Sequence, residues 1–191
     1  MQRVRLLTIV AGLSLALAGN VQAATLLSST TDLPSDVFSA PTFSTGTLVG
    51  VTGSVSGQYA SPFGDYTSPY NAVQSGSATY EFGGPFNRLS FVFGSPDDYN
   101  NITFLRNGIP VDTFFTTGTS LDRGSNYFVT LGTGLRFDAV RFTSGTPALE
   151  FSNVSVSAVP LPASAPMFGA ALLALAGLGY SAKRKKASTA A

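Results

Sequence analysis

The feature that most constrains the fold is a recurrent alternation of apolar and polar residues in short runs, each closed by turn residues. Leu89, Phe91 and Phe93 alternate with Ser90 and Val92, which places the three large side chains on one face of an extended strand. Asn107-Gly108, between two further runs, is a strong hairpin signal. No helix-period run of useful length interrupts this pattern. The sequence therefore predicts an all-β domain.

The strand pattern in the second half of this domain predicts an antiparallel β-sandwich that is jelly-roll-like in its strand spacing. Strands are expected over residues 89–93, 101–105, 109–115, 127–131, 135–143 and 148–157. The glycines at positions 118, 124, 132, 134 and 145 are interpreted as corners between them. The side chains expected in the core are Leu89, Phe91, Phe93, Phe104 and Phe137.

The first half of the domain, residues 24–80, is rich in Ser and Thr and nearly free of charge, yet it carries interleaved aromatic residues. We expect short strands at 47–59 and 78–82, joined by a long loop at 60–71. An unstructured adhesive stalk is the alternative, although a disordered segment would carry more charge and fewer aromatics.

The residue types that are missing exclude several kinds of chemistry. The chain of 191 residues has no Cys, His or Trp, and its lysines all lie near the C-terminus. These absences exclude a Cys or His nucleophile–base pair, thiolate and imidazole zinc sites, Schiff-base chemistry in the body, and disulfides. Residues 24–158, hereafter the body, hold five arginines against ten acidic residues, a formal net charge of −5. An acidic body argues against a nucleic-acid partner.

Residues 1–23 have the three parts of a secretory signal peptide. Arg3 and Arg5 form a charged start, residues 6–18 are apolar, and Val21-Gln22-Ala23 supplies a small-x-small cleavage pattern. We expect cleavage after Ala23, with Ala24 as the next choice. A retained membrane anchor is the alternative, but the apolar stretch is short for a span.

The C-terminus also has three parts in a fixed order. A proline motif precedes an uncharged stretch, 165–180, which as a helix would be ~24 Å long against a hydrocarbon core of ~30 Å. A basic cluster follows and would stay in the cytoplasm, which leaves the body outside the inner membrane. The motif is Val159, Pro160, Leu161, Pro162 and Ala163, and the basic cluster is Lys183, Arg184, Lys185 and Lys186. An ordinary single-pass anchor is the alternative.

This tail resembles the PEP-CTERM sorting signal, in the variant whose motif reads Val-Pro-Leu-Pro-Ala. The resemblance implies that an exosortase, a membrane protease-transpeptidase, recognises the tail and removes it as the protein moves to the cell surface. Export machinery and the membrane during sorting would be the other partners. The stretch 86–157 is also similar to a recurring module of exosortase-dependent surface proteins, with Ser152-Asn153 where related sandwiches often carry Asp-Asn.

Two sets of acidic residues are candidates for chemistry. Glu81 and Glu150 are the only glutamates, and a glycosidase would need such a carboxylate pair within ~5–10 Å; we expect both to be single outward-facing charges instead. Asp97 and Asp98 lie in a turn with no nearby basic residue in sequence, so calcium is a candidate ligand. An ordinary turn, with side chains bonded to their own backbone, is the alternative.

Three functions follow from these observations, and none of them needs a catalytic residue except the last. The first is a non-catalytic structural or adhesive protein of the surface or extracellular matrix. The second is a carbohydrate-binding module for exopolysaccharide, with a groove lined by exposed tyrosines. The least favoured is a two-carboxylate glycoside hydrolase. The tyrosines proposed for the groove are Tyr59, Tyr66, Tyr70 and Tyr99.

Overall fold

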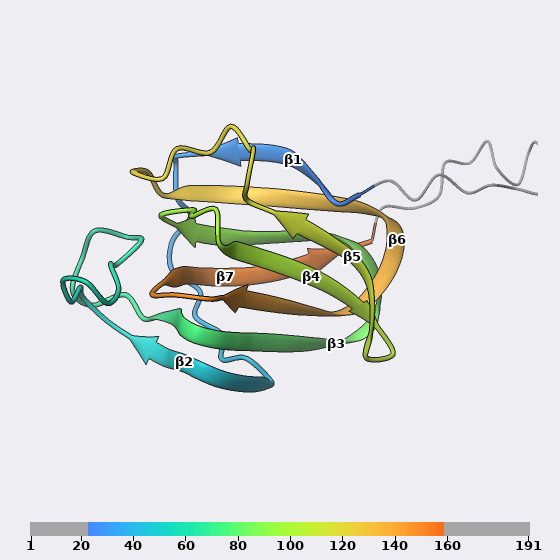
Figure 1. Cartoon of the computed structure of the whole chain (residues 1–191), viewed down its shortest axis with the longest axis horizontal. Coiled ribbons are helices and arrows are strands. Elements are labelled where there is room, and N and C mark those ends of the chain that lie inside the picture. Colours follow the sequence, from blue (N-terminus) through green and yellow to red (C-terminus); the bar gives the residue numbers. More distant parts are fainter. Residues whose placement is uncertain (1–22, 159–191) are drawn as a thin grey trace, which may run out of the picture.

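The computed structural model describes residues 23–158, and within them every regular element is a β-strand (Figure 1). The strands are β1 (Thr25–Thr30), β2 (Phe43–Val51), β3 (Tyr70–Gly94), β4 (Asn100–Arg106), β5 (Ile109–Phe115), β6 (Tyr127–Ser144) and β7 (Leu149–Ser157). All pairings are antiparallel. The prediction of an all-β fold is confirmed.

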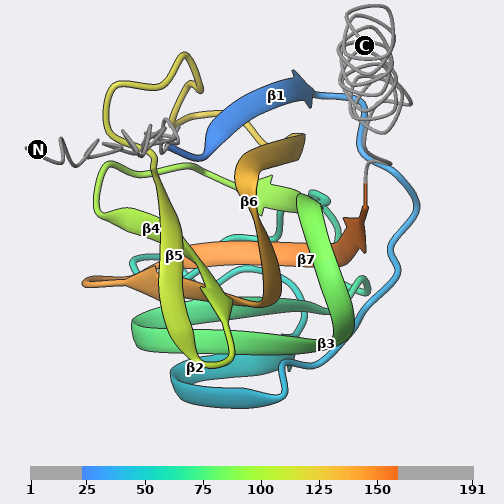
Figure 2. The same cartoon turned by 90° about the vertical axis from the view of Figure 1, so that its right-hand side faces the viewer.

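The seven strands form one hydrogen-bonded sheet in the order β2-β3-β6-β4-β5, with β1 added to β6 and β7 added to β3. Strand β3 has 25 residues, and its register shifts between Glu81 and Phe86. Figure 2 shows β3 turning sharply midway along its length. Gly83 and Gly84 lie in this interval, and glycine permits the backbone to bend there.

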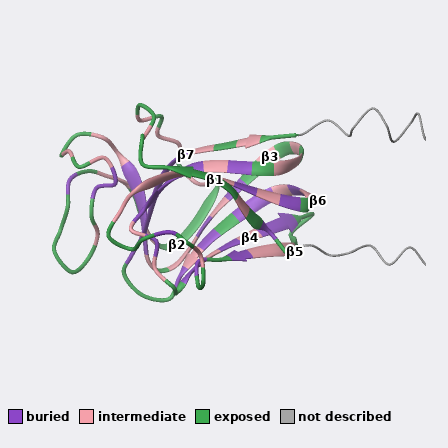
Figure 3. Cartoon of the chain, turned by 90° about the horizontal axis from the view of Figure 1, so that it is seen from above, coloured by how far each residue is buried: buried purple, intermediate pink, exposed green. Residues whose placement is uncertain are grey.

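Strand β7 lies between the two ends of β3. Its residue Phe151 is opposite Asn71 near the start of β3 and opposite Phe93 near its end. The sheet therefore curls until both ends of one strand pair with the same neighbour. The inner face of this curl encloses the core, and buried and exposed stretches alternate along the strands (Figure 3).

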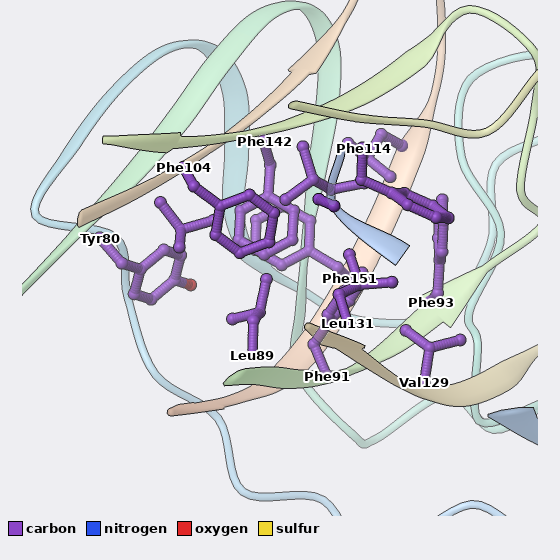
Figure 4. Packing of buried hydrophobic residues seen from close by; sticks show 14 of the residues in the cluster. Tyr80, Leu89, Phe91, Phe93, Phe104, Phe114, Val129, Leu131, Phe142 and Phe151 are labelled. Carbon is purple, nitrogen blue, oxygen red and sulfur yellow. The ribbon is translucent and has the colours of Figure 1, made fainter. Parts of the chain in front are cut away.

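The core is dominated by phenylalanines (Figure 4). Phe142 and Phe151 stack with their ring centroids 4.1 Å apart, and Phe91 meets Phe142 edge-on at 5.0 Å. Burying one such side chain contributes roughly 1.5–3 kcal/mol to folding. The predicted core is confirmed, because all five of its members are fully buried: Leu89, Phe91, Phe93, Phe104 and Phe137.

The hairpin predicted at Asn107-Gly108 is confirmed. Strand β4 ends at Arg106 and β5 begins at Ile109, so the loop has two residues. Both have positive φ, 52° at Asn107 and 76° at Gly108, as a type I′ turn requires. The twist of this turn matches the twist of the two strands and fixes their register.

Several predicted boundaries are wrong. Residues 127–131 and 135–143 belong to one strand, β6, so the glycines at 132 and 134 lie within a strand and are not corners. The segments 78–82 and 89–93 likewise belong to β3. In each case the strand continues past its glycines, and the pairing of β3 with β6 resumes beyond them after a register shift.

The first half contains more structure than its sequence pattern suggested. Strand β1 was not predicted, and β2 ends at Val51, where a strand was predicted up to residue 59. The loop that follows runs over residues 52–69, with a single bridge between Val55 and Tyr59. Gly53, at a φ of 67°, supplies the turn that ends β2 early.

The segment between β1 and β2 is fastened to β7 by side chains. The Asn153 amide nitrogen donates to Ser35 O at 2.7 Å, and its oxygen accepts from Val37 N at 2.9 Å. The Ser152 hydroxyl donates to Asp36 Oδ1 at 3.0 Å. Ser152-Asn153, noted in the sequence for its place in the last strand, thus holds residues 35–37 against β7.

Candidate functional site

The sorting motif 159–163 and the basic cluster 183–186 lie outside the described residues. Ala23, the predicted cleavage position, is exposed, and Ala24 is already buried at the start of β1. In the described stretch, 23–158, no helix is long and apolar enough to cross a membrane.

The two glutamates do not form a carboxylate pair. Glu150 is opposite Ala72 in the pairing of β7 with β3, and Glu81 lies nine residues farther along β3. At about 3.3 Å per residue this is roughly 30 Å of strand. A two-carboxylate glycosidase needs ~5–10 Å, so Glu81 and Glu150 cannot serve as its acid and nucleophile together.

Glu81 is exposed as predicted, but the prediction that Glu150 faces outward is wrong. Only 4% of Glu150 is exposed, because β7 is enclosed between the ends of β3 and the 52–69 loop lies over it. Its Oε1 accepts a hydrogen bond from Ala60 N at 2.9 Å. Burial raises the pKa of the carboxyl from its ordinary value of 4.5 to about 7, the Ala60 N–H opposes this rise, and the charge on Asp97 adds to it.

A hollow of about 310 Å³, hereafter the loop hollow, opens beside Glu150. Its other walls come from residues 54–60 and from Pro147 and Ala148. The Tyr99 hydroxyl lies nearby, 2.6 Å from Asp97 Oδ2 and 3.1 Å from Pro147 O. The carboxyls of Asp97 and Glu150 thus approach the same end of the molecule from the β3–β4 turn and from β7.

The two aspartates of the β3–β4 turn have separate partners. Asp98 forms an exposed ion pair with Arg123, and Asp97 accepts from Tyr99. No basic residue is close to this turn in sequence, but the loop after β5 brings Arg123 back to Asp98 in space. Among residues 23–158 no three acidic, His or Cys side chains converge as a metal site.

The backbone carbonyl of Asp97 accepts hydrogen bonds that stabilise the β3–β4 turn. It accepts from the Thr116 hydroxyl and from Asn100 N, the latter at 3.0 Å. Thr117 likewise donates to Asp98 O at 2.8 Å. The backbone carbonyls of Asp97 and Asp98, which could also serve as calcium ligands, thus fasten the β3–β4 turn to the residues after β5.

The four tyrosines do not line one groove. Tyr70 is fully buried, and its hydroxyl donates to Gly53 O at 2.6 Å. Tyr59 is half-buried and meets Tyr70 edge-on at 6.3 Å, so it lines the loop hollow alone. Tyr66 is 81% exposed on the loop, and Tyr99 is bonded at the β3–β4 turn. The predicted tyrosine groove is wrong in its composition.

A larger hollow than the loop hollow lies elsewhere, on the outer face of the sheet over β2, β3, β6 and the β4–β5 turn. Its volume is about 990 Å³, and we call it the outer groove. Strand register aligns Phe43, Thr79 and Arg141 directly opposite one another on this face. Directly opposed residues point to the same side of a sheet, so the three side chains form one row across three strands.

A second row explains why this face is hollow. It joins Glu81, Ala139 and Leu105 from β3, β6 and β4. The small Ala139 side chain keeps the floor low, while Asn107 and Gly108 of the hairpin turn form part of the wall. The floor is buried and apolar, and its neighbour Glu81 is exposed.

The outer groove carries both signs of charge. The Asp138 carboxylate accepts from Asn107 N at 3.0 and 3.1 Å, and this holds the turn in place. Arg141 Nε donates to Thr79 Oγ1 at 3.4 Å. In the described part of the chain, the Glu81 carboxylate and the terminal nitrogens of Arg141 have no protein partner. The groove thus offers one free acceptor group and one free donor group.

Sequence reasoning missed the outer groove because its members come from strands far apart in the chain. The only local signal is the alternation of side chains along β3, where Ser77, Thr79 and Glu81 alternate with two buried residues, Ala78 and Tyr80. This alternation predicts a polar outward face but not its partner strands. Comparisons of the chain with protein-family models, with curated proteins and with solved structures found no match.

Proposed function

We propose that this chain is an exported, exosortase-sorted protein of the cell surface or extracellular matrix, with a non-catalytic structural or adhesive body. The observation that carries the proposal is the extent of the folded domain. Its strands run from Thr25 to Ser157, which fits the body expected between the two terminal signals. On this proposal the protein is held briefly in the inner membrane by its C-terminal tail and then released.

The interior of the body supports a structural role. The domain is held by a continuous cluster of phenylalanines and has no cysteine to cross-link it. The usual nucleophile–base residue types are missing, and the two glutamates are far apart along β3. A matrix protein needs a stable shape and adhesive surfaces more than a reaction centre.

The intact mass of the protein recovered from extracellular material tests the sorting proposal. We expect a mature chain that begins near Ala24 and lacks Lys183–Lys186. Replacing Pro160 and Pro162 by alanine should leave the protein in the inner membrane, because the extended proline motif is lost. A released protein that still carries its basic end would contradict the proposal.

We also propose that the curled sheet is a jelly-roll-like sandwich with β3 and β6 shared between its layers. The pairing of β7 with both ends of β3 supports this architecture. Short inter-strand proton distances by NMR would test it. Contacts from Phe151 to both Asn71 and Phe93 are expected, and contacts to only one of them would contradict it.

Carbohydrate binding is the second candidate function, and the outer groove is the observation that favours it. An exported protein of the extracellular matrix meets polysaccharide as its commonest neighbour. Binding would take place at the outer groove and not at the tyrosines expected from the sequence.

A further inference from the structure

We propose that the outer groove binds an uncharged polysaccharide chain, with Phe43 against a sugar ring and with Arg141 and Glu81 bonding its hydroxyls. The choice of ligand rests on the proposed surface location. The groove itself rests on geometry: about 990 Å³ of hollow over four strands, with aligned rows of side chains for its base.

Phe43 provides the apolar surface that the ligand needs. It is 60% exposed at the start of β2, whereas most aromatic residues of the neighbouring β3 are buried. The groove thus presents an aromatic face at its rim and an alanine on its floor. A pyranose ring has an apolar face of C–H groups, which packs on such an aromatic surface while its hydroxyls stay at the ring edge.

The polar groups match the edge of a sugar. Each sugar hydroxyl both donates and accepts, so a site for it needs donors and acceptors side by side. Arg141 supplies donors and Glu81 supplies an acceptor, and both retain free groups within residues 23–158. The hydroxyls of Thr45 and Ser77, also in the lining, can act in either direction.

Charge decides between neutral and acidic polymers. The groove holds Glu81 and Asp138 against Arg141, and the body as a whole is acidic. An acidic polysaccharide would meet net repulsion from both, whereas an uncharged chain would not. The ligand is therefore a neutral chain.

The size of the groove suits an oligosaccharide segment. From β2 through β3 and β6 to β4 there are three inter-strand spacings, which at ~4.8 Å each span roughly 14 Å. A hollow of about 990 Å³ is at the upper end of the ~300–1,000 Å³ range of small-ligand sites, as an extended chain of sugars would need.

The test uses the full chain, purified from its native cells in the processed form they hold. Binding is measured with cellohexaose and maltohexaose as neutral probes and with hexagalacturonate as the acidic probe. We expect saturable binding of a neutral probe, little changed by salt, and at least tenfold weaker in Phe43→Ala and in Arg141→Ala. Tyr66→Ala, which removes an exposed aromatic outside the groove, is the matched control and should bind as the unmodified protein does.

A further variant tests the groove by filling its floor. Ala139→Leu adds bulk to the floor while leaving Phe43, Arg141 and Glu81 in place, and it should also weaken binding at least tenfold. Failure of both neutral probes to bind, preference for hexagalacturonate, or unchanged binding in Phe43→Ala would each overturn the proposal. The mass of the processed chain is read separately, so a failure of the sorting proposal is distinguishable from a failure of the groove.

Discussion

The outer groove and the loop hollow each contain one of the two glutamates, and the two carboxyl groups lie in opposite environments. Glu81 lies in the open groove and is exposed. Glu150 is buried at the far end of β3, where its pKa rises to about 7. The difference teaches that strand parity alone does not decide exposure, because the 52–69 loop covers the side of β7 on which Glu150 lies.

The largest expected effect concerns the core that supports both sites. Phe91 is fully buried against Phe93 and Phe142, so Phe91→Ala should lower the free energy of unfolding by ~3–5 kcal/mol. Denaturant unfolding followed by near-UV circular dichroism measures this. Phe115→Ala, at a side chain 60% exposed, is the control and should change stability by less than ~0.5 kcal/mol. Equal stability of the two variants would mean that Phe91 is not part of the core.

The second prediction contrasts the two glutamates by pH. The pKa of Glu150 is raised in the folded protein, so its contribution to stability is complete below pH 4.5 and is lost as the pH rises through about 7. A rise from 4.5 to about 7 corresponds to about 3 kcal/mol. Burial also raises the pKa values of the adjacent Tyr70 and Tyr99, which stay neutral over this range.

Glu150→Gln, which cannot ionise, should therefore be more stable than the unmodified protein at pH 8 and similar to it at pH 4. Thermal unfolding across this pH range measures the difference. Glu81→Gln makes the same substitution at an exposed glutamate and is the control for the chemical change itself. If Glu150→Gln keeps the pH dependence of the unmodified protein, ionisation of Glu150 does not account for that dependence.

A smaller effect is expected at the wall of the outer groove. Gly108 has a φ of 76° and open space around it, so Gly108→Ala should cost about 1 kcal/mol through backbone strain alone. Gly134 has equally open space but no positive φ, which makes Gly134→Ala the matched control. Urea midpoints of the two variants give the comparison. A cost shared by both variants would point to a cause other than the turn.

The smallest effect is expected for calcium at the β3–β4 turn. Asp98 is compensated by Arg123 and Asp97 is bonded by Tyr99, so thermal melts with excess Ca²⁺ and with chelator should superimpose. A bound ion at 100 times its dissociation constant would stabilise the fold by ~2.7 kcal/mol, which such melts resolve easily. A clear shift that disappears in the Asp97→Asn, Asp98→Asn double variant would restore the calcium site.

Local patterns predicted the parts of the fold that depend on neighbouring residues. The alternation around Phe91 and the Asn107-Gly108 turn each identify a strand or a hairpin, because side-chain parity and turn conformation are local properties. The outward prediction for Glu150 was wrong because Leu149 and Phe151, on the opposite parity, are buried as well. The 52–69 loop, some 90 residues earlier in the chain, packs over Glu150, and no local pattern contains this contact.

The candidate site was predictable to a smaller extent. Phe43 and Arg141 are 98 residues apart in the chain, and they lie in one row because each is opposite the same residue of β3. The ion pair of Asp98 with Arg123 depends on the path of a loop. Strand β1 carries Leu27 on its exposed side and few large apolar residues, so its alternation was too weak to detect. These features arise from tertiary contacts that a single sequence does not reveal.

If the protein is exported as proposed, the pairing of β3 with β6 and β7 also sets the order in which it can fold on the way. A chain that emerges N-terminus first presents β3 early, yet the second half of β3 pairs with no strand until β6 and β7 arrive. Long-range pairings of this kind are slow to form, since a large loop must close before any contact stabilises it. We therefore expect the nascent body to stay open, and exposed to proteases and chaperones, until its last strand has crossed the membrane. Closure of the sheet would then take place at the membrane surface, only a few residues before the expected sorting motif.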